Sequence, residues 1–162
     1  MKNLQQAITD GLLPGLLAGA AVMATVAARG RQDSGSAIAP INATSHILWG
    51  DAAAEEESIT ARHTLPGALI NLGSGVWWAS VFETLFGDSV DRRGPGAAAV
   101  GSLATAGIAY LLDYKMLPER LTPGWEKRIS GLSLAMGLGA LALGIGIGAV
   151  WERRMRGELS VH

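Results

Sequence analysis

The sequence predicts an all-α, polytopic membrane protein in which four transmembrane helices form a bundle packed through small residues. Charged residues make up only 17% of the 162 residues and hydrophobic residues 49%, whereas about a quarter of a typical soluble domain is charged. The charges are also confined to short stretches between four uncharged runs. We therefore expect helices over about residues 11–28, 64–86, 94–114 and 129–151 of a single membrane domain, residues 1–162.

Each uncharged run is long enough to cross a bilayer. The runs hold 18, 19, 19 and 23 residues, and crossing the hydrocarbon core takes about 20. A helix of a soluble bundle would show a polar stripe, but the last run has no polar face beyond two serines. The modest mean hydropathy of +0.27 fits a soluble Ala/Gly-rich bundle better, although the long polar connections lower that average.

The first expected helix has a signal peptide as its alternative. Lys2 would be the basic flank of such a peptide. Asp10, Pro14 and the three later spans favour a helix that is retained.

Residues 29–63, between the first two spans, are expected to form an interfacial and loop region. Residues 39–50 are uncharged but too short to cross, so we expect them to lie at the membrane surface. Residues 51–63 contain strong helix formers, and the three glutamates at 55–57 are expected to face water.

Small residues recur at every fourth position of the expected helices. This spacing places them on one helix face, and close approach through small residues holds helices together in lipid. We expect such contacts, within one chain or between chains, and a glycine-lined pore is the alternative. The glycines concerned are Gly11, Gly15, Gly19, Gly67, Gly75, Gly101, Gly144 and Gly148.

The region before the second helix contains polar residues that could form a site. Asn42 and His46 lie four residues apart, and His63 precedes the second helix. Histidine and carboxylate side chains are zinc ligands, and histidine titrates near neutral pH. A metal site or proton-active site on His46 and His63 is therefore one hypothesis. Histidines that simply form hydrogen bonds at the interface are the alternative.

Asn71 and Glu83 lie on one stripe of the second helix. An unsatisfied amide is costly inside a membrane, so Asn71 needs a partner, which we expect on the first or fourth helix. Glu83 lies near the far membrane surface. Intramembrane carboxylates are often functional, but a position at the helix end also permits simple solvation.

Tryptophans and basic residues describe the membrane boundaries. Trp49, Trp125 and Trp151 lie at or next to expected helix ends, where amphipathic rings prefer the headgroup layer. Trp77 and Trp78 lie inside the second helix and are expected to pack against neighbours. Six basic residues lie on one side of the expected topology and seven on the other, so the sequence predicts no orientation.

Composition and motifs exclude several classes of function. The chain has no cysteine, which excludes disulfides and thiolate metal sites. A near-zero net charge, with 13 basic and 14 acidic residues, argues against nucleic-acid binding. Because no nucleophile elbow, phosphate loop or dinucleotide fingerprint occurs in a suitable context, we expect no catalytic residue, cofactor or bound metal.

Three stretches resemble a group of small bacterial inner-membrane proteins of unassigned function. They are NATSHILWGD (42–51), RHTLPG (62–67) and DYKMLPERLTPGWEKR (113–128). In size and helix layout, the chain is also loosely similar to membrane proteins of unknown function associated with acid tolerance. The resemblance implies a multi-pass location in the bacterial inner (cytoplasmic) membrane and supplies no catalytic residues.

Three functions follow from these patterns. The first is a non-enzymatic structural or accessory protein whose partners are the lipid bilayer, other copies of the chain or other membrane subunits. The second is a small solute or ion transporter or channel that uses the Asn71/Glu83 face. The third is a membrane metal-binding protein or enzyme that uses His46 and His63.

Overall fold

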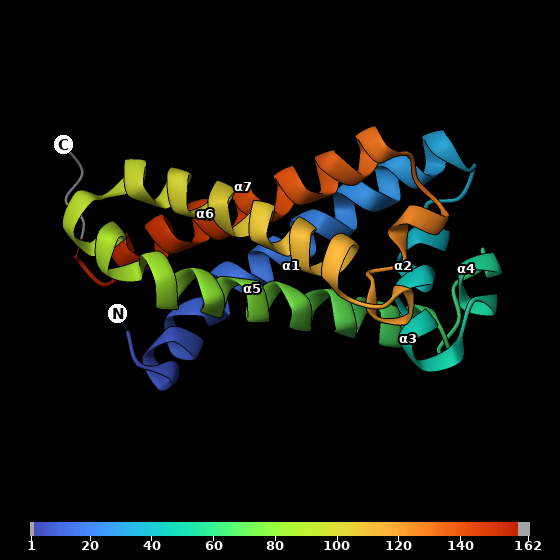
Figure 1. Cartoon of the computed structure of the whole chain (residues 1–162), viewed down its shortest axis with the longest axis horizontal. Coiled ribbons are helices and arrows are strands. Elements are labelled where there is room, and N and C mark those ends of the chain that lie inside the picture. The colour runs from blue at the N-terminus through green and yellow to red at the C-terminus, as the bar shows by residue number, and fades with distance from the viewer. Residues whose placement is uncertain (1, 159–162) are drawn as a thin grey trace. The chain divides into compact units, whose positions relative to one another are not determined.

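The computed structural model describes residues 2–158, which are mostly helical and contain no β-strand. The all-α prediction is confirmed. Four long helices occupy the stretches where the sequence predicts them (Figure 1). They are α1 (Leu4–Asp33), α5 (Thr64–Arg93), α6 (Pro95–Leu111) and α7 (Gly131–Met155).

Three of these helices are long and apolar enough to cross a membrane, fewer than the four expected. They are α1, α7 and α6 together with the π-helical turn η1 (Leu112–Met116) that continues it. Helix α5 has 30 residues, so its length suffices. Its composition does not, because Asn71 and Glu83 interrupt the apolar sequence and its two tryptophans and several small residues add little hydropathy.

The junction between α5 and α6 is a tight glycine–proline turn. Gly94 adopts a left-handed φ of +70°, and its amide N–H donates a hydrogen bond to the carbonyl of Val90. This is the usual end of a helix at glycine. Pro95 then begins α6, where its missing N–H costs nothing.

The described part of the chain forms two compact units. The first unit comprises described residues 2–21, 72–108 and 139–158, and the second comprises residues 22–71 and 109–138. The first unit therefore consists of segments of all four long helices. The second unit adds the short helices α2 (Ala39–Thr44), α3 (His46–Trp49) and α4 (Ala52–Glu55) and the 3-10 turns η2 (Glu119–Leu121) and η3 (Trp125–Lys127).

Glycines allow close helix approach in the first unit. A Cβ on Gly75 of α5 would lie 2.8 Å from the backbone nitrogen of Gly19 on α1. On α7, a Cβ at Gly144 would overlap the backbone of Ala18 on α1. Four more of the glycines expected to pack helices also leave no room for a side chain. An added Cβ would contact Ser80 at Gly11, Val76 at Gly15, Phe86 at Gly101 and Pro14 at Gly148.

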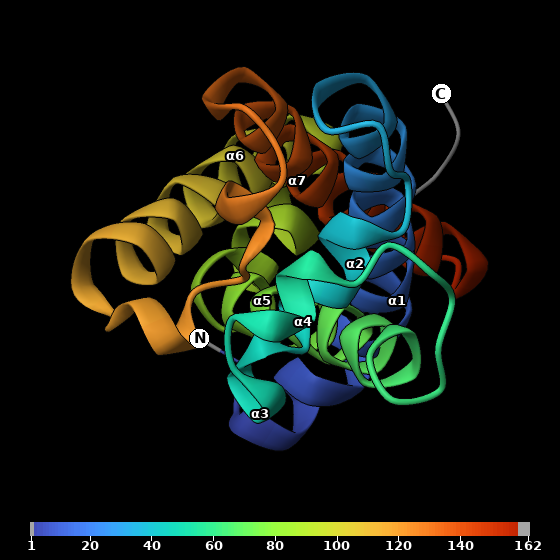
Figure 2. The same cartoon turned by 90° about the vertical axis from the view of Figure 1, so that its right-hand side faces the viewer.

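The second unit contains the segment expected at the membrane surface. Helices α2 and α3 have six and four residues, too few to cross a bilayer. Figure 2 shows α2, α3 and α4 close to one another, and α2 also contacts η3. Gly67 at the start of α5 allows α2 to approach, because a Cβ there would overlap the carbonyl oxygen of Ile41.

The tryptophans follow the sequence expectation only in part. Trp49 and Trp151 are about half exposed, and Trp78 is buried. Trp125 is 7% exposed, and its indole N–H donates to the Thr44 hydroxyl. Trp77, which was expected like Trp78 to pack against neighbours, is 63% exposed in this chain.

Candidate functional site

A buried ion pair joins Glu83 of α5 to Arg153 of α7 in the first unit. Both side chains are completely buried. The guanidinium donates from NH1 to Glu83 Oε1 (2.9 Å) and from NH2 to Oε2 (2.8 Å), and its Nε donates to Asp91 Oδ1 (2.7 Å). Two parallel bonds are the strongest guanidinium–carboxylate arrangement. Glu83 is therefore neutralised inside the protein and is not a solvated residue at a helix end.

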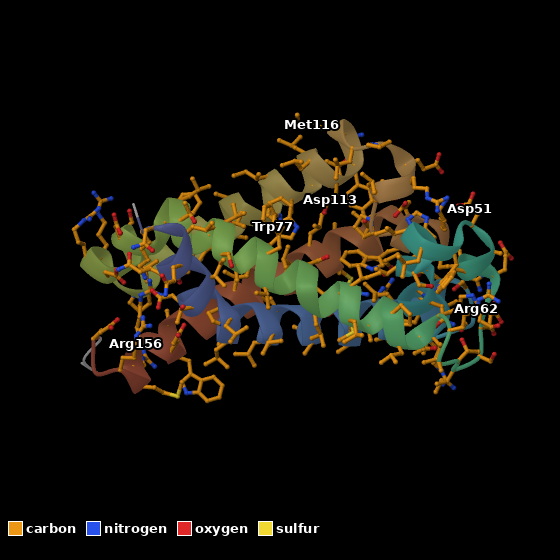
Figure 3. All side chains as sticks on the ribbon, turned by 90° about the horizontal axis from the view of Figure 1, so that it is seen from below. Asp51, Arg62, Trp77, Asp113, Met116 and Arg156 are labelled. Carbon is orange, nitrogen blue, oxygen red and sulfur yellow. The ribbon has the colours of Figure 1, made fainter. Side chains whose placement is uncertain are left out.

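Lys2 and Arg156 extend this pair into a larger ionic cluster. Lys2 Nζ lies 2.9 Å from Glu83 Oε2 and 2.6 Å from Asp10 Oδ2, and Arg156 NH1 lies 2.7 Å from Asp10 Oδ1. Burial opposes the charge of Lys2, but its hydrogen bonds to Asp10 and Glu83 raise its pKa above the ordinary value. Figure 3 shows Arg156 among the charged side chains near the C-terminal end of α7.

A cavity of about 700 Å³ lies beside the cluster in the first unit. Its lining includes Lys2, Asp10 and Arg153. Each basic group of the cluster has acidic partners: Lys2 pairs with Asp10 and Glu83, Arg153 with Glu83 and Asp91, and Arg156 with Asp10, Glu152 and Glu158. Because each group has a partner of opposite charge, the cluster is suited to clamp helices together.

Asn71 anchors a separate, uncharged network in the second unit. Its Nδ2 donates to Thr44 Oγ1 (3.0 Å) on α2 and to the carbonyl of Gly67 (2.9 Å) on its own helix. The same Thr44 oxygen accepts the indole N–H of Trp125 (3.1 Å). The expectation of a partner on the first or fourth helix is wrong. Since Gly67 lets α2 approach α5, a short helix supplies the hydroxyl.

Asn42 fastens the chain between α4 and α5. Its Nδ2 donates to the carbonyls of Glu56 (2.8 Å) and Ser58 (3.0 Å). Its Oδ1 accepts the hydroxyl of Thr64 (2.7 Å), the first residue of α5. With its donors and acceptor occupied, Asn42 positions the start of α5.

His46 is buried on α3 beside a small cavity. Its Nε2 lies 2.9 Å from the carbonyl oxygen of Thr122, to which it donates, because a carbonyl can only accept. Its Nδ1 lies 3.8 Å from Asp51 Oδ1, and Asp51 in turn pairs with Lys127 at 3.1 Å. That hydrogen bond with Lys127 lowers the pKa of Asp51. The cavity measures about 170 Å³.

His63 has a different set of partners from His46. Its Nδ1 lies 3.3 Å from the hydroxyl of Thr60, which also accepts the backbone N–H of His63. In the described part of the chain, no group of three or more His, Asp or Glu side chains could hold a metal ion. The two histidines therefore serve separate hydrogen bonds in this structure.

Sequence reasoning missed the cations that neutralise Glu83. In the sequence, Arg153 is only one of several basic residues at a helix end, and Lys2 is only a flank of the first span. The usable signal is the carboxylate itself, because a buried charge is costly unless it is paired. Lys2 and Arg153 are among the basic residues on the same side of the expected topology as the end of the second helix, which places them among the cations within reach.

Comparisons with known proteins add no relative to this description. No protein-family model matches the chain, and no curated protein or solved structure is significantly similar to it.

Proposed function

We propose that this chain is a non-enzymatic integral membrane protein that crosses the bilayer four times. It serves as a structural or accessory subunit of a homo-oligomer or of a larger membrane complex. The observation that supports this best is that all five polar residues expected to form a site are engaged by partners within the chain. A site for substrate or solute would leave polar groups free to meet its ligand. The five residues are Asn42, His46, His63, Asn71 and Glu83.

The partners of its polar residues also support α5 as the fourth crossing. A hydropathy average counts Asn71 and Glu83 as if their side chains faced lipid. Both side chains are instead buried and hydrogen-bonded within the protein. The cost of placing them in the membrane is therefore largely removed. A helix of 30 residues is about 45 Å long, which exceeds the roughly 30 Å of the hydrocarbon core. Helices α2 and α3 would then lie at the membrane surface.

Single cysteines test the four crossings directly, because the chain has no cysteine of its own. We would introduce cysteine at Gln32, Arg93, Glu119 and Arg154 and label intact cells or sealed vesicles with an impermeant maleimide. Gln32 and Glu119 should be labelled from one side and Arg93 and Arg154 from the other. If Gln32 and Arg93 are labelled from the same side, α5 does not cross and the proposed topology fails.

Purification in a mild detergent tests the accessory role. We expect the tagged chain, extracted from bacterial inner membranes, to elute with stoichiometric additional subunits or as an oligomer of defined mass. The location in the bacterial inner membrane is proposed from the sequence resemblance. A monodisperse monomer without partners that also moves a solute into liposomes would contradict the accessory role.

A transporter is the second candidate, favoured by the cavity beside the ionic cluster. Lys2 lines this cavity and also contacts Glu83, so a solute that displaced Lys2 would reach a buried carboxylate. Liposome flux that disappears in Glu83→Gln and persists in Glu57→Gln would establish this function. Glu57 is a suitable control because it is an exposed glutamate of the second unit.

A further inference from the structure

An apolar groove runs between α6 and α7 in the first unit. Its volume is about 680 Å³, and its lining comes from α6 residues between positions 95 and 103 and α7 residues between positions 139 and 154. Figure 2 shows the two helices next to each other, and a Cβ on Gly146 of α7 would lie 2.9 Å from the Ser102 hydroxyl of α6. The groove therefore lies beside the contact between α6 and α7, in space that the side chains of these two helices do not fill.

The walls of the groove are exposed and hydrophobic. Leu103 of α6 is 65% exposed, and Leu143 and Ile147 of α7 are 65% and 63% exposed. At Gly139 an added Cβ would meet no atom within 4 Å, so the groove is open there. In a membrane protein, such a surface faces hydrocarbon.

One end of the groove carries the exposed cation Arg154. This residue lines the groove and makes no side-chain hydrogen bond or ion pair with residues 2–158. The neighbouring Arg153 and Arg156 are both held in ion pairs. Trp151, one turn before Arg154, lines the same end and is 49% exposed. A tryptophan and an arginine together are typical of the headgroup layer of a membrane.

We infer that the α6–α7 groove binds one anionic phospholipid, with an acyl chain along the apolar walls and the phosphate at Arg154. The inference rests on the membrane location proposed above. From Gly139 to Arg154, α7 rises about 22 Å, enough for one leaflet's share of the hydrocarbon core, about 15 Å, plus the headgroup layer. A guanidinium binds phosphate through two parallel hydrogen bonds. Charge complementarity at this end therefore selects an anionic lipid.

Two substitutions separate the headgroup contact from the acyl-chain contact. Arg154→Gln removes the cation and leaves the groove open. Gly139→Leu fills the groove from within and leaves the cation in place, because the Cβ of the new side chain would lie in open space. Arg31→Gln and Gly107→Leu are matched controls, because Arg31 is exposed and Gly107 also faces open space, but neither lines the groove.

Native mass spectrometry of the full chain, extracted from membranes and delipidated, gives the readout. The chain is titrated with phosphatidylglycerol or with phosphatidylcholine of the same acyl chains. We expect about fivefold preference for phosphatidylglycerol, the effect of one basic residue near an anionic lipid. Arg154→Gln should abolish the preference, and Gly139→Leu should remove most binding of both lipids. Both controls should behave as the original chain does.

Three outcomes would overturn the inference. Equal binding of the two lipids by the original chain, or an unchanged preference in Arg154→Gln, would show that Arg154 does not hold a headgroup. A lipid-free dimer that Gly139→Leu dissociates would show that a second copy occupies the groove. A chain that never enters the membrane fraction would instead refute the proposed membrane function, so the two failures are distinguishable.

Discussion

Replacing Glu83 with glutamine removes one charge from the fully buried pair with Arg153 while preserving the size of the side chain. In this variant the Arg153 guanidinium keeps its ion pair with Asp91, which is 2.7 Å long in the original chain. The two carboxylate oxygens of Glu83 that it contacts in the original chain are replaced by a neutral amide. Breaking a buried ion pair by removing one partner costs about 3–5 kcal/mol. Because Asp91 remains, we expect the lower end of that range, about 3 kcal/mol of lost unfolding free energy.

Denaturation in mixed detergent micelles, followed by tryptophan fluorescence, measures this loss. Glu57→Gln is the control, since this exposed side chain lies outside the cluster and loses only a surface ion pair with Arg128, which contributes little. The double variant Glu83→Leu with Arg153→Met removes both charges and should recover much of the stability, because apolar residues of similar volume can replace a buried pair at little cost. A loss of unfolding free energy below about 0.5 kcal/mol in Glu83→Gln would show that the ion pair does not hold α5 and α7 together. The carboxylate would then be available for another role.

Three further predictions concern other contacts. Gly144→Leu should cost about 3 kcal/mol of unfolding free energy and reduce folded yield, because its side chain would overlap the backbone of Ala18; unchanged melting would show that this face points to lipid. Asn71→Ala should cost only about 1 kcal/mol in the same assay, and a loss of transport without loss of stability would favour a transporter. Lys127 lowers the pKa of Asp51, so the stability gained from this pair is complete above pH 3.8 and falls below it. Asp51→Asn should therefore be less stable near neutral pH and show a weaker acid dependence in a pH-resolved melting series.

Periodicity and charge spacing were enough to predict the four long helices. Charges interrupt apolar runs where helices leave a membrane, and this signal is local in sequence. The helix ends were less predictable. For example, α1 extends to Leu4 and Asp33, beyond the expected residues 11–28, because charged residues can continue a helix outside the apolar core.

Partners of buried polar residues could not be predicted in the same way. The need of Asn71 for a hydrogen bond is visible in the sequence, but the identity of its partner depends on which element approaches the Gly67 face. The short helix that carries Thr44 makes this approach. Similarly, the sequence marks Glu83 as costly in lipid but does not show that Arg153 reaches it, since α5 and α7 are separated by a whole helix along the chain.

The two polar positions of α5 are satisfied by different chemistry, and this bears on the proposed crossing of the membrane by α5. Asn71 relies on a neutral hydroxyl, that of Thr44, whereas Glu83 relies on the charges of Arg153 and Lys2. An unpaired carboxylate in hydrocarbon is much more costly than an unpaired amide. The insertion of α5 should therefore depend more on its cationic partners than on Thr44. An α5 that fails to cross in Arg153→Met but crosses in Thr44→Val, both scored by a cysteine at Arg93, would establish that order.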